Sequence, residues 1–269
     1  MILLKAEDIC KSVKNGKGET EILKNISLEI EKGSFTVIMG SSGAGKSTLL
    51  YALSGTDKIS GGKIYLNGEE ISSANEKRLS EIRTKSFGFV FQEGNLVSNL
   101  TLEENIKVAG FLKKDRSEKE TCLKVDELLE KMNLKEAAKR LPVEASGGEN
   151  QRCAIARAVI NEPEIIFADE PTGALNRANS DEVLKLFTDL NNGGQTILMV
   201  THDLKSAVRG EKIIYLEDGK IEGTLEMGKF AVGNCGNAGG KNGQNCKNGS
   251  STEAEREKFL SDWLQKKGW

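Results

Sequence analysis

The chain of 269 residues is short of several features, and each shortage narrows what the protein can be. Lys and Arg (38) nearly balance Asp and Glu (40), so no strong basic field indicates a nucleic-acid or anionic-lipid partner. No apolar run approaches the roughly 20 residues that span a bilayer. The start, Met-Ile-Leu-Leu-Lys, is too short and too soon charged for a signal peptide. We therefore expect a soluble protein that serves a membrane, if at all, through a partner.

Cysteine is sparse and unpaired. The five positions are Cys10, Cys122, Cys153, Cys235 and Cys246, an odd number without the regular spacing of a disulfide framework. No Cys-x-x-Cys pair or Cys/His cluster offers a zinc site. This usage is typical of reduced thiols in a cytosolic protein. Cys235 and Cys246 receive no role.

The first part of the chain predicts an antiparallel sheet. Residues 26–30 (Ile-Ser-Leu-Glu-Ile) alternate apolar and polar side chains, as a half-buried strand does. Residues 63–66 are followed by Asn67-Gly68, which is typical of a hairpin with a type I′ turn. We expect these strands to lie beside a separate core.

Three nearly continuous apolar runs predict a second, parallel sheet. They occupy residues 34–39, 165–168 and 196–200, and such runs fit strands buried on both faces. A helix is expected after each, as in alternating βα domains. One of them is predicted after Ser180, with Val183, Leu184, Phe187 and Leu190 on one face, and it ends at residues 191–193.

Two further segments differ in character from this core. A charged stretch predicts an inserted helical subdomain at about residues 97–160, with an apolar stripe of Leu123, Leu128, Leu129 and Met132. After a core of residues 1–228, residues 229–251 are rich in Gly and Asn and predict a flexible linker.

The chain ends in a predicted amphipathic helix at residues 252–269. Thr252 and Glu255 form a capping-box pattern at its start. Its apolar side is expected to carry Phe259, Leu260, Trp263 and Leu264. The helix either docks on a partner subunit or packs on its own domain, and the sequence leaves both open.

Residues 40–48 match the phosphate-binding pattern Gly-x-x-x-x-Gly-Lys-[Ser/Thr]. Small residues let backbone N–H groups surround phosphates, and the following helix directs its positive end at them. Lys46 is expected to neutralise the β- and γ-phosphates of ATP, and the Ser47 hydroxyl to ligate Mg²⁺. The predicted nucleotide-binding residues are Gly40, Ser41, Ser42, Gly43, Ala44, Gly45, Lys46, Ser47 and Thr48.

An acidic pair follows the apolar run at 165–168. Asp169 suits a Walker-B role, in which a carboxylate holds Mg²⁺ through its water shell. Glu170 is placed next to it to polarise the attacking water. Such a pair is often structural when it stands alone, but together with the phosphate loop it indicates catalysis.

A second anion site is predicted at residues 146–149. Ser146 is a candidate helix N-cap with Glu149 three residues on. The simple interpretation is a capped helix. However, Gly147 and Gly148 behind the serine expose several N–H groups at the helix N-terminus, which favours an anion.

These residues together resemble the nucleotide-binding subunit of ABC transporters, over about residues 1–228. The resemblance implies that Ser146, Gly147 and Gly148 bind the γ-phosphate of ATP held by the opposite subunit. Gln92 matches the glutamine that contacts Mg²⁺ and reports to the membrane partner, residues 173–176 match the D-loop, and His202, the single histidine, matches the switch histidine. The implied fold is an α/β P-loop NTPase with a mixed, largely parallel core sheet, an antiparallel β subdomain and an inserted α-helical subdomain.

Within the family, residues 168–176 are similar to the bacterial branch for lipoprotein release, macrolide export and antimicrobial-peptide resistance. The final Trp263-Leu264 and Gly268-Trp269 resemble most the bacitracin-type resistance group. Three departures stand out. Ala145 and Glu149 replace the ends of the usual Leu-Ser-Gly-Gly-Gln signature, Asn176 replaces an aspartate, and Val13 stands where an aromatic residue stacks on adenine. We expect weak adenine stacking. The added Glu149 carboxylate should repel the γ-phosphate, but this cost is small if Glu149 turns back to cap the Ser146 N–H.

The expected protein is a transport ATPase on the cytoplasmic face of the cell membrane. A homodimer would sandwich two MgATP head to tail, with Glu170, His202 and Gln92 as catalytic residues and Ser47, Gln92 and Asp169 around Mg²⁺. A separate integral-membrane permease is the implied partner. The alternative is an ATPase that powers a membrane signalling or cell-wall-regulating complex. DNA-repair and translation ATPases of the family are disfavoured, because this chain has one motif set and no long insertion.

Overall fold

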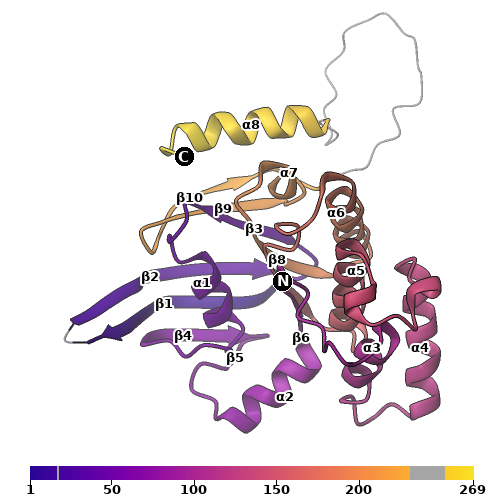
Figure 1. The fold of residues 1–269 in the computed structure, drawn as a ribbon. Coiled ribbons are helices and arrows are strands. Elements are labelled where there is room, and N and C mark those ends of the chain that lie inside the picture. The colour runs from indigo at the N-terminus through magenta and orange to yellow at the C-terminus, as the bar shows by residue number, and fades with distance from the viewer. Residues whose placement is uncertain (17, 231–251) are drawn as a thin grey trace, which may run out of the picture.

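The computed structural model describes residues 1–16, 18–230 and 252–269 (Figure 1). Most of the predicted linker, with Cys235 and Cys246, lies outside the described residues. Within them, no helix combines the length and the apolar character that crossing a bilayer requires.

The core is a six-stranded sheet with the order β10-β9-β3-β8-β7-β6. Neighbouring strands from β9 to β6 run parallel, and β10 pairs antiparallel at one edge. The predicted mixed, largely parallel sheet is confirmed. Its strands are β3 (Phe35–Gly40), β6 (Phe87–Val90), β7 (Ile165–Asp169), β8 (Thr196–Val200), β9 (Lys212–Glu217) and β10 (Lys220–Glu226).

Both faces of this sheet are covered, which explains the unbroken apolar runs. In β3, Val37 and Met39 belong to the hydrophobic cluster on one face, whereas Ile38 belongs to the cluster on the other. Successive side chains of a strand point to opposite faces, so a strand buried on both sides is apolar at nearly every position, and Thr36 is the buried polar side chain of β3. The first cluster includes residues of the helical insert, and the second includes those of α1 (Lys46–Leu53) and the antiparallel sheet.

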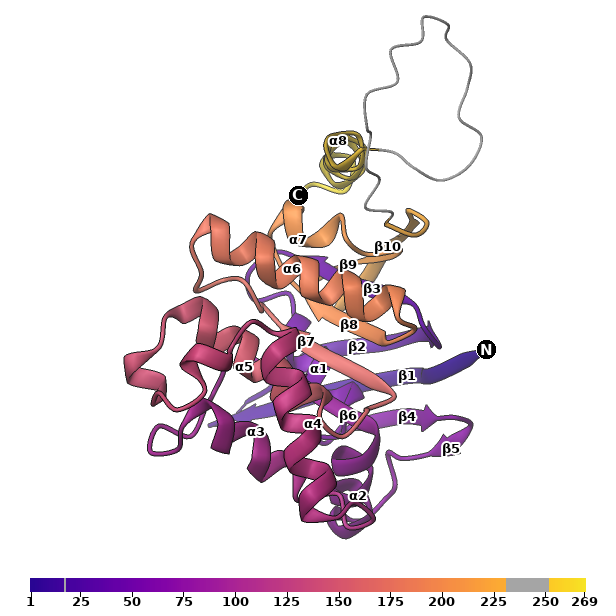
Figure 2. The same ribbon diagram turned by 90° about the vertical axis from the view of Figure 1, so that its right-hand side faces the viewer.

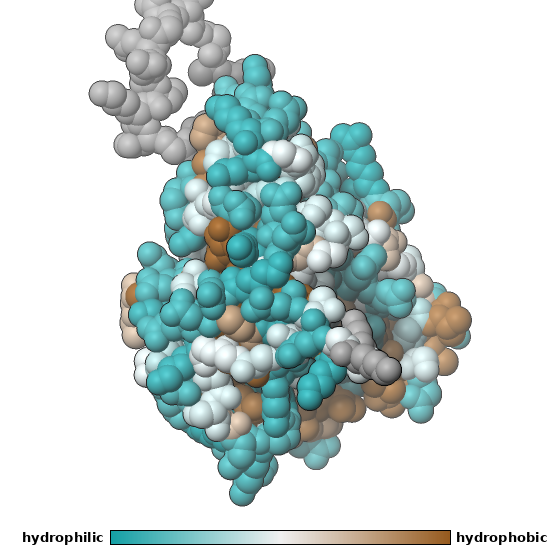
Figure 3. All heavy atoms as spheres, turned by 90° about the vertical axis from the view of Figure 1, so that its left-hand side faces the viewer, coloured by the Kyte–Doolittle hydropathy of each residue, from teal (hydrophilic) through white to brown (hydrophobic). Residues whose placement is uncertain are grey.

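The predicted antiparallel β subdomain is a four-stranded sheet with the order β2-β1-β4-β5 (Figure 1). Asn67 and Gly68 have φ values of 51° and 82°, the left-handed pair that a type I′ turn requires. The face of the molecule on this side is mostly hydrophilic, with apolar side chains in scattered groups (Figure 3). The strands are β1 (Ile2–Asn15), β2 (Gly18–Glu31), β4 (Gly61–Leu66) and β5 (Glu69–Glu70).

The helical insert lies between β6 and β7 and packs beside the core sheet (Figure 2). It comprises α3 (Leu102–Gly110), α4 (Glu118–Lys131), the short 3-10 helices η1 (Lys135–Ala137) and η2 (Pro142–Glu144), and α5 (Gly147–Val159). Outside the insert, α2 (Glu76–Ser86) precedes β6, α6 (Arg177–Asn192) precedes β8, and α7 (Leu204–Ala207) precedes β9. Helix α6 begins before the predicted start at Ser180, because the Asn176 side chain accepts a hydrogen bond from the Asn179 N–H and caps it.

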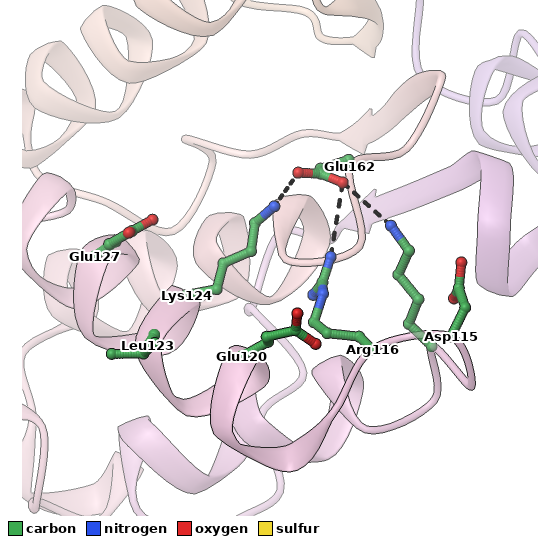
Figure 4. A pocket seen from close by; sticks show the side chains of 8 residues that line it. Asp115, Arg116, Glu120, Leu123, Lys124, Glu127 and Glu162 are labelled. Atoms are coloured by element: carbon green, nitrogen blue, oxygen red, sulfur yellow. Dashed lines mark hydrogen bonds and ion pairs between the residues drawn. The ribbon is translucent and has the colours of Figure 1, made fainter.

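A cluster of charges fastens the insert at the base of β7 (Figure 4). The Glu162 carboxylate pairs with Lys124 and with Lys113 and Arg116, at 3.1 and 3.7 Å for the latter two. Salt bridges to these lysines hold the pKa of Glu162 down at about 2. Because Glu162 precedes β7 and Asp169 ends it, this cluster lies at the amino-terminal end of the strand, and the acidic pair of Asp169 and Glu170 lies at its carboxyl end. We interpret it as structural.

The last helix, α8 (Glu253–Gln265), packs on its own domain beside α7, β9 and β10 (Figures 1 and 2). Leu260 and Leu264 are fully buried, but Phe259 is 55% exposed, so its predicted place on the apolar side is wrong. The reason is the i, i+4, i+8 stripe of Arg256, Leu260 and Leu264, from which Phe259 is rotated away. Arg256 is buried and donates to four backbone carbonyls.

Candidate nucleotide site

The phosphate loop joins the end of β3 to α1. A Cβ atom at Gly40 would lie 2.1 Å from the carbonyl oxygen of Leu216, so only glycine fits there. Gly45, the N-cap of α1, has a φ of 97°, which also favours glycine. The Lys46 Nζ donates to the carbonyl oxygens of Gly40 and Ser41 at 2.9 and 2.8 Å. Burial lowers the pKa of Lys46, and the nearby carboxylates of Glu170 and Asp169 oppose this shift.

Asp169 is held by two hydroxyl groups from one face of α1. The Ser47 Oγ donates to Oδ1 at 2.9 Å, and the Tyr51 hydroxyl donates to Oδ2 at 2.8 Å. Ser47 and Tyr51 are one helical turn apart, so their side chains point the same way. Burial, with the hydrogen bond to Asp169, raises the pKa of Tyr51 to about 12. The Walker-B candidate and the candidate Mg²⁺ ligand Ser47 are therefore in direct contact.

Glu170 and His202 meet at the neighbouring ends of β7 and β8. His202 Nδ1 lies 2.8 Å from Glu170 Oε1. A carboxylate can only accept, so with Glu170 ionised Nδ1 carries the proton. Glu170 has a φ of 48°, unusual for a non-glycine residue, and the following Pro171 disfavours the right-handed helical alternative. Backbone strain of this kind is found most often at functional sites.

Gln92 follows β6 and is exposed. A Cβ atom at Gly173 would lie 3.0 Å from its Nε2, so the glutamine lies against the predicted D-loop. Gln92 and Asp169 also line one cavity of about 270 Å³, together with Tyr51 and Phe91. Asp169 ends β7, and Gln92, Glu170 and His202 follow β6, β7 and β8. These predicted site residues thus lie together where the parallel strands present their carboxyl ends.

Two residues of α5 fasten the Gln92 loop to the insert. The buried Gln151 donates through Nε2 to the Phe91 carbonyl at 2.9 Å. Arg157 donates to the carbonyls of Gly94 and Asn95, both at 2.6 Å. Burial lowers the pKa of Arg157. Both residues fall within the insert predicted at about residues 97–160, but nothing in the sequence indicates a partner for either of them.

The second predicted anion site lies apart from the first. Ser146, Gly147 and Gly148 begin α5 in the insert, and within the described residues no hydrogen bond joins them to the loop at 40–48. The capping box is present, as the sequence predicts. Glu149 Oε2 accepts from the Ser146 N–H at 2.7 Å, and Glu149 Oε1 accepts from Arg140 at 3.1 Å. The Ser146 N–H bond in particular lowers the pKa of Glu149.

The three departures are therefore of unequal weight. Glu149 is occupied as a cap and is paired with Arg140, which reduces its repulsion of an incoming phosphate. Asn176 keeps the capping function that an aspartate would have, without the charge. Val13 lies on β1, is 37% exposed and offers no ring to a nucleobase.

The donor set fits Mg²⁺ bound together with a nucleotide. Mg²⁺ uses few protein oxygen ligands and takes the others from phosphates and water. In the described parts of the chain no three His, Cys, Asp or Glu side chains gather in a way that could hold a metal ion by themselves. A serine hydroxyl and an aspartate at the mouth of a phosphate loop match the shared mode and not a self-sufficient metal centre.

A phosphate loop on β3, an acidic pair ending β7 and a histidine after β8 define a P-loop ATPase. The additional helical insert and antiparallel sheet define the ABC cassette version of that fold. The chain belongs to the ABC transporter family, whose sequence profile matches residues 23–173.

Relatives place it more closely. The chain is 44% identical over 223 residues to the lipoprotein-releasing system ATP-binding protein LolD of Aquifex aeolicus, covering 83% of this chain and 97% of that protein. It is 40% identical over 221 residues to the macrolide export ATP-binding/permease protein MacB of Mannheimia succiniciproducens, covering 82% of this chain but 34% of that longer protein. The dimeric ATP-binding cassette MJ0796, bound to ADP and Pi, has a TM-score of 0.79 and 38% identity, covering 85% of this chain and 100% of that one. The protein is an ABC-type ATPase, the ATP-binding subunit of an ABC transporter of the LolD/MacB-like branch.

Proposed function

We propose that two copies of this chain close head to tail around two MgATP and drive a separate integral-membrane permease that exports or confers resistance to antimicrobial peptides. The complex would hold the chain at the cytoplasmic face of the cell membrane. The observation that carries the dimer is the separation of the two anion sites. Lys46 and Ser146 serve the same phosphates in this proposal, yet α1, which begins at Lys46, packs on one face of the core sheet and α5, which follows Ser146, packs on the other. We therefore assign the serine at each nucleotide to a second copy. The dimeric relative bound to ADP and Pi supports this arrangement.

The reaction follows from the positions of the side chains. Lys46 would turn from the loop carbonyls to the β- and γ-phosphates, and the N-terminus of α1 would stabilise their charge. Glu170 would orient and polarise a water for in-line attack on the γ-phosphate, with His202 fixing the direction of its carboxylate. Mg²⁺ supplies charge neutralisation across the phosphates when bound. Ser47, Asp169 and Gln92 are the residues that would hold it.

An exposed apolar surface supports a permease contact. Val108 on α3, Phe111 at its C-cap and Leu112 in the turn that follows are 50%, 48% and 58% exposed, so the end of this helix presents three apolar side chains to solvent. Val97, 47% exposed, is held beside this helix by Asn105. Such side chains on the insert, joined through α5 to the Gln92 loop, would let a permease receive the motion of the nucleotide site.

Support for the substrate class comes from the sequence. Residues 168–176 are similar to the branch that includes lipoprotein release, macrolide export and peptide resistance, and the Trp-containing C-terminus resembles the last of these. A separate permease is favoured by the relative LolD, an ATP-binding protein of nearly the same extent as the matched region.

Glu170→Gln tests the ATPase and the dimer. The substitution keeps the shape of the side chain and removes the base, so hydrolysis should fall by roughly 100- to 10,000-fold. With MgATP the variant should elute as a dimer in size-exclusion chromatography, whereas Ser146→Arg added to it should return the monomer. A Glu170→Gln protein that stays monomeric, or that hydrolyses at the parental rate, refutes the proposal.

The transport step needs a second experiment. The chain and its permease, reconstituted in proteoliposomes, should move a labelled bacitracin-type peptide in an ATP-dependent way, and Glu170→Gln should abolish this flux. ATP hydrolysis that responds to the peptide without any flux would instead indicate a signalling complex. In that case the transport part of the proposal fails while the ATPase part stands.

A further inference from the structure

Tyr51 makes a contact that the nucleotide chemistry described above does not use. Its hydroxyl donates to Asp169 Oδ2 at 2.8 Å, while Ser47 donates to Oδ1 at 2.9 Å. Both oxygens of the Walker-B carboxylate are therefore engaged by α1. A carboxylate held at one oxygen can still swing about its χ2 torsion, but one held at both is fixed in a single plane.

The tyrosine ring is itself held in place. Its centroid lies 6.4 Å from that of Phe91, at an interplanar angle of 38°. Phe91 directly precedes Gln92, and Tyr51, Phe91, Gln92 and Asp169 line the same cavity. The phenol thus stands between the helix of the phosphate loop and the Gln92 loop, facing the oxygen atoms assigned to Mg²⁺.

We propose that Tyr51 is a positioning residue, which orients Asp169 and so sets the affinity of the nucleotide site for Mg²⁺. The inference rests on the proposed function of that site. The Ser47 hydroxyl can give its proton to Asp169 and its lone pair to the metal at the same time. Tyr51 occupies the other oxygen and directs the remaining lone pairs of the carboxylate. Groups that hydrogen-bond metal-site ligands change metal affinity by 10- to 100-fold when removed.

Tyr51→Phe isolates the hydroxyl, because the ring and its packing on Phe91 remain. A fluorescent ATP analogue should bind the variant with parental affinity in EDTA. The Mg²⁺ concentration that gives half of the Mg²⁺-dependent fluorescence change should rise by about 10-fold. Mn²⁺ binding to the ATP complex, followed by electron paramagnetic resonance, should weaken to a similar degree. At saturating Mg²⁺ the kcat should return to within about threefold of the parent. Tyr65→Phe, on β4 away from the site, is the matched control and should change none of these quantities.

The outcomes separate this inference from the broader one. A parent protein that binds no nucleotide would refute the proposed function. A parent that binds MgATP normally, with Tyr51→Phe showing an unchanged Mg²⁺ midpoint, would refute only the role of Tyr51. A loss of ATP affinity in EDTA as large as the loss in Mg²⁺ would also overturn it, because it would show that the hydroxyl supports the fold of the site and not the metal. Phe91→Leu, which loosens the ring, should shift the midpoint in the same direction by less.

Discussion

The docking of α8 can be tested through Arg256, whose guanidinium is almost entirely enclosed. The residue is 4% exposed and donates to the carbonyls of Val208, Gly210, Met227 and Gly228 at 2.9, 2.7, 2.8 and 3.1 Å. Arg256→Met keeps much of the aliphatic stem but removes every donor. At about 1 kcal/mol for each hydrogen bond, the helix should lose on the order of 4 kcal/mol of docking free energy.

The chain provides its own probe for this event. Its two tryptophans, Trp263 and Trp269, both belong to the C-terminal segment, and Trp263 packs edge-on against Tyr215 at 6.4 Å. Tryptophan fluorescence in urea therefore reports α8, while circular dichroism reports the whole fold. Because α8 should then undock before the rest of the domain unfolds, the fluorescence midpoint should fall below that of the parent and separate from the dichroism midpoint.

Lys258→Met is the matched control, since Lys258 is exposed on the same helix. It should leave both midpoints within about 0.3 M of the parent, because surface substitutions change stability by about 0.5 kcal/mol or less. If Arg256→Met leaves the fluorescence midpoint in place, the four carbonyl contacts do not hold the helix and this reasoning is refuted.

Three further outcomes are expected. Glu162→Gln should lower the free energy of unfolding by about 0.5–1 kcal/mol at neutral pH, a modest effect because the carboxylate is 62% exposed. Since the folded pKa of Glu162, about 2, lies below its ordinary 4.5, this contribution is present above pH 4.5 and is lost as the pH falls toward 2. The gap between variant and parent in thermal melts should therefore close over that range, and a constant gap would contradict it. Asn176→Ala should lower the free energy of unfolding, measured by chemical denaturation, by about 1 kcal/mol because it removes the cap of α6. Asn176→Asp keeps a capping oxygen and should retain the parental stability. Equal losses in both variants would show that the cap is not responsible. Val13→Tyr should tighten ATP binding by about 5- to 10-fold through base stacking and increase the preference for ATP over GTP in competition assays. An unchanged affinity would show that another residue already stacks on the base.

Patterns carried by neighbouring residues were readable from the sequence. The phosphate loop, the capping boxes at Ser146 and Thr252, and the Asn67-Gly68 turn depend on a few adjacent positions, and the structure has all of them. The three apolar runs also predicted strands buried on both faces. The start of α6 was placed too late because Asn176 was considered only as part of a loop motif, although asparagine is among the best N-caps.

Contacts between distant segments were not readable. Tyr51 meets Asp169 only because α1 and the end of β7 are neighbours in the fold, and nothing near residue 51 signals an acidic partner. The burial of Arg256 could not be predicted either, because a charged residue on an amphipathic helix is expected to face water. The four carbonyls that surround it come from a loop after α7 and from the end of β10, which local periodicity cannot bring together.

The hydrogen bonds from Gln151 and Arg157 to the backbone of residues 91–95 couple α5 to the Gln92 loop. Ser146, at the N-terminal end of the helix, would reach the nucleotide of the other protomer in the proposed dimer, while Gln151 and Arg157 further along attach the helix to the Gln92 loop. In the proposed dimer, a displacement of the Gln92 loop would therefore be passed through these bonds to the N-terminus of α5. The nucleotide bound to one protomer would thus influence the position of Ser146 at the nucleotide of the other protomer. The two sites would then hydrolyse ATP in a coordinated way.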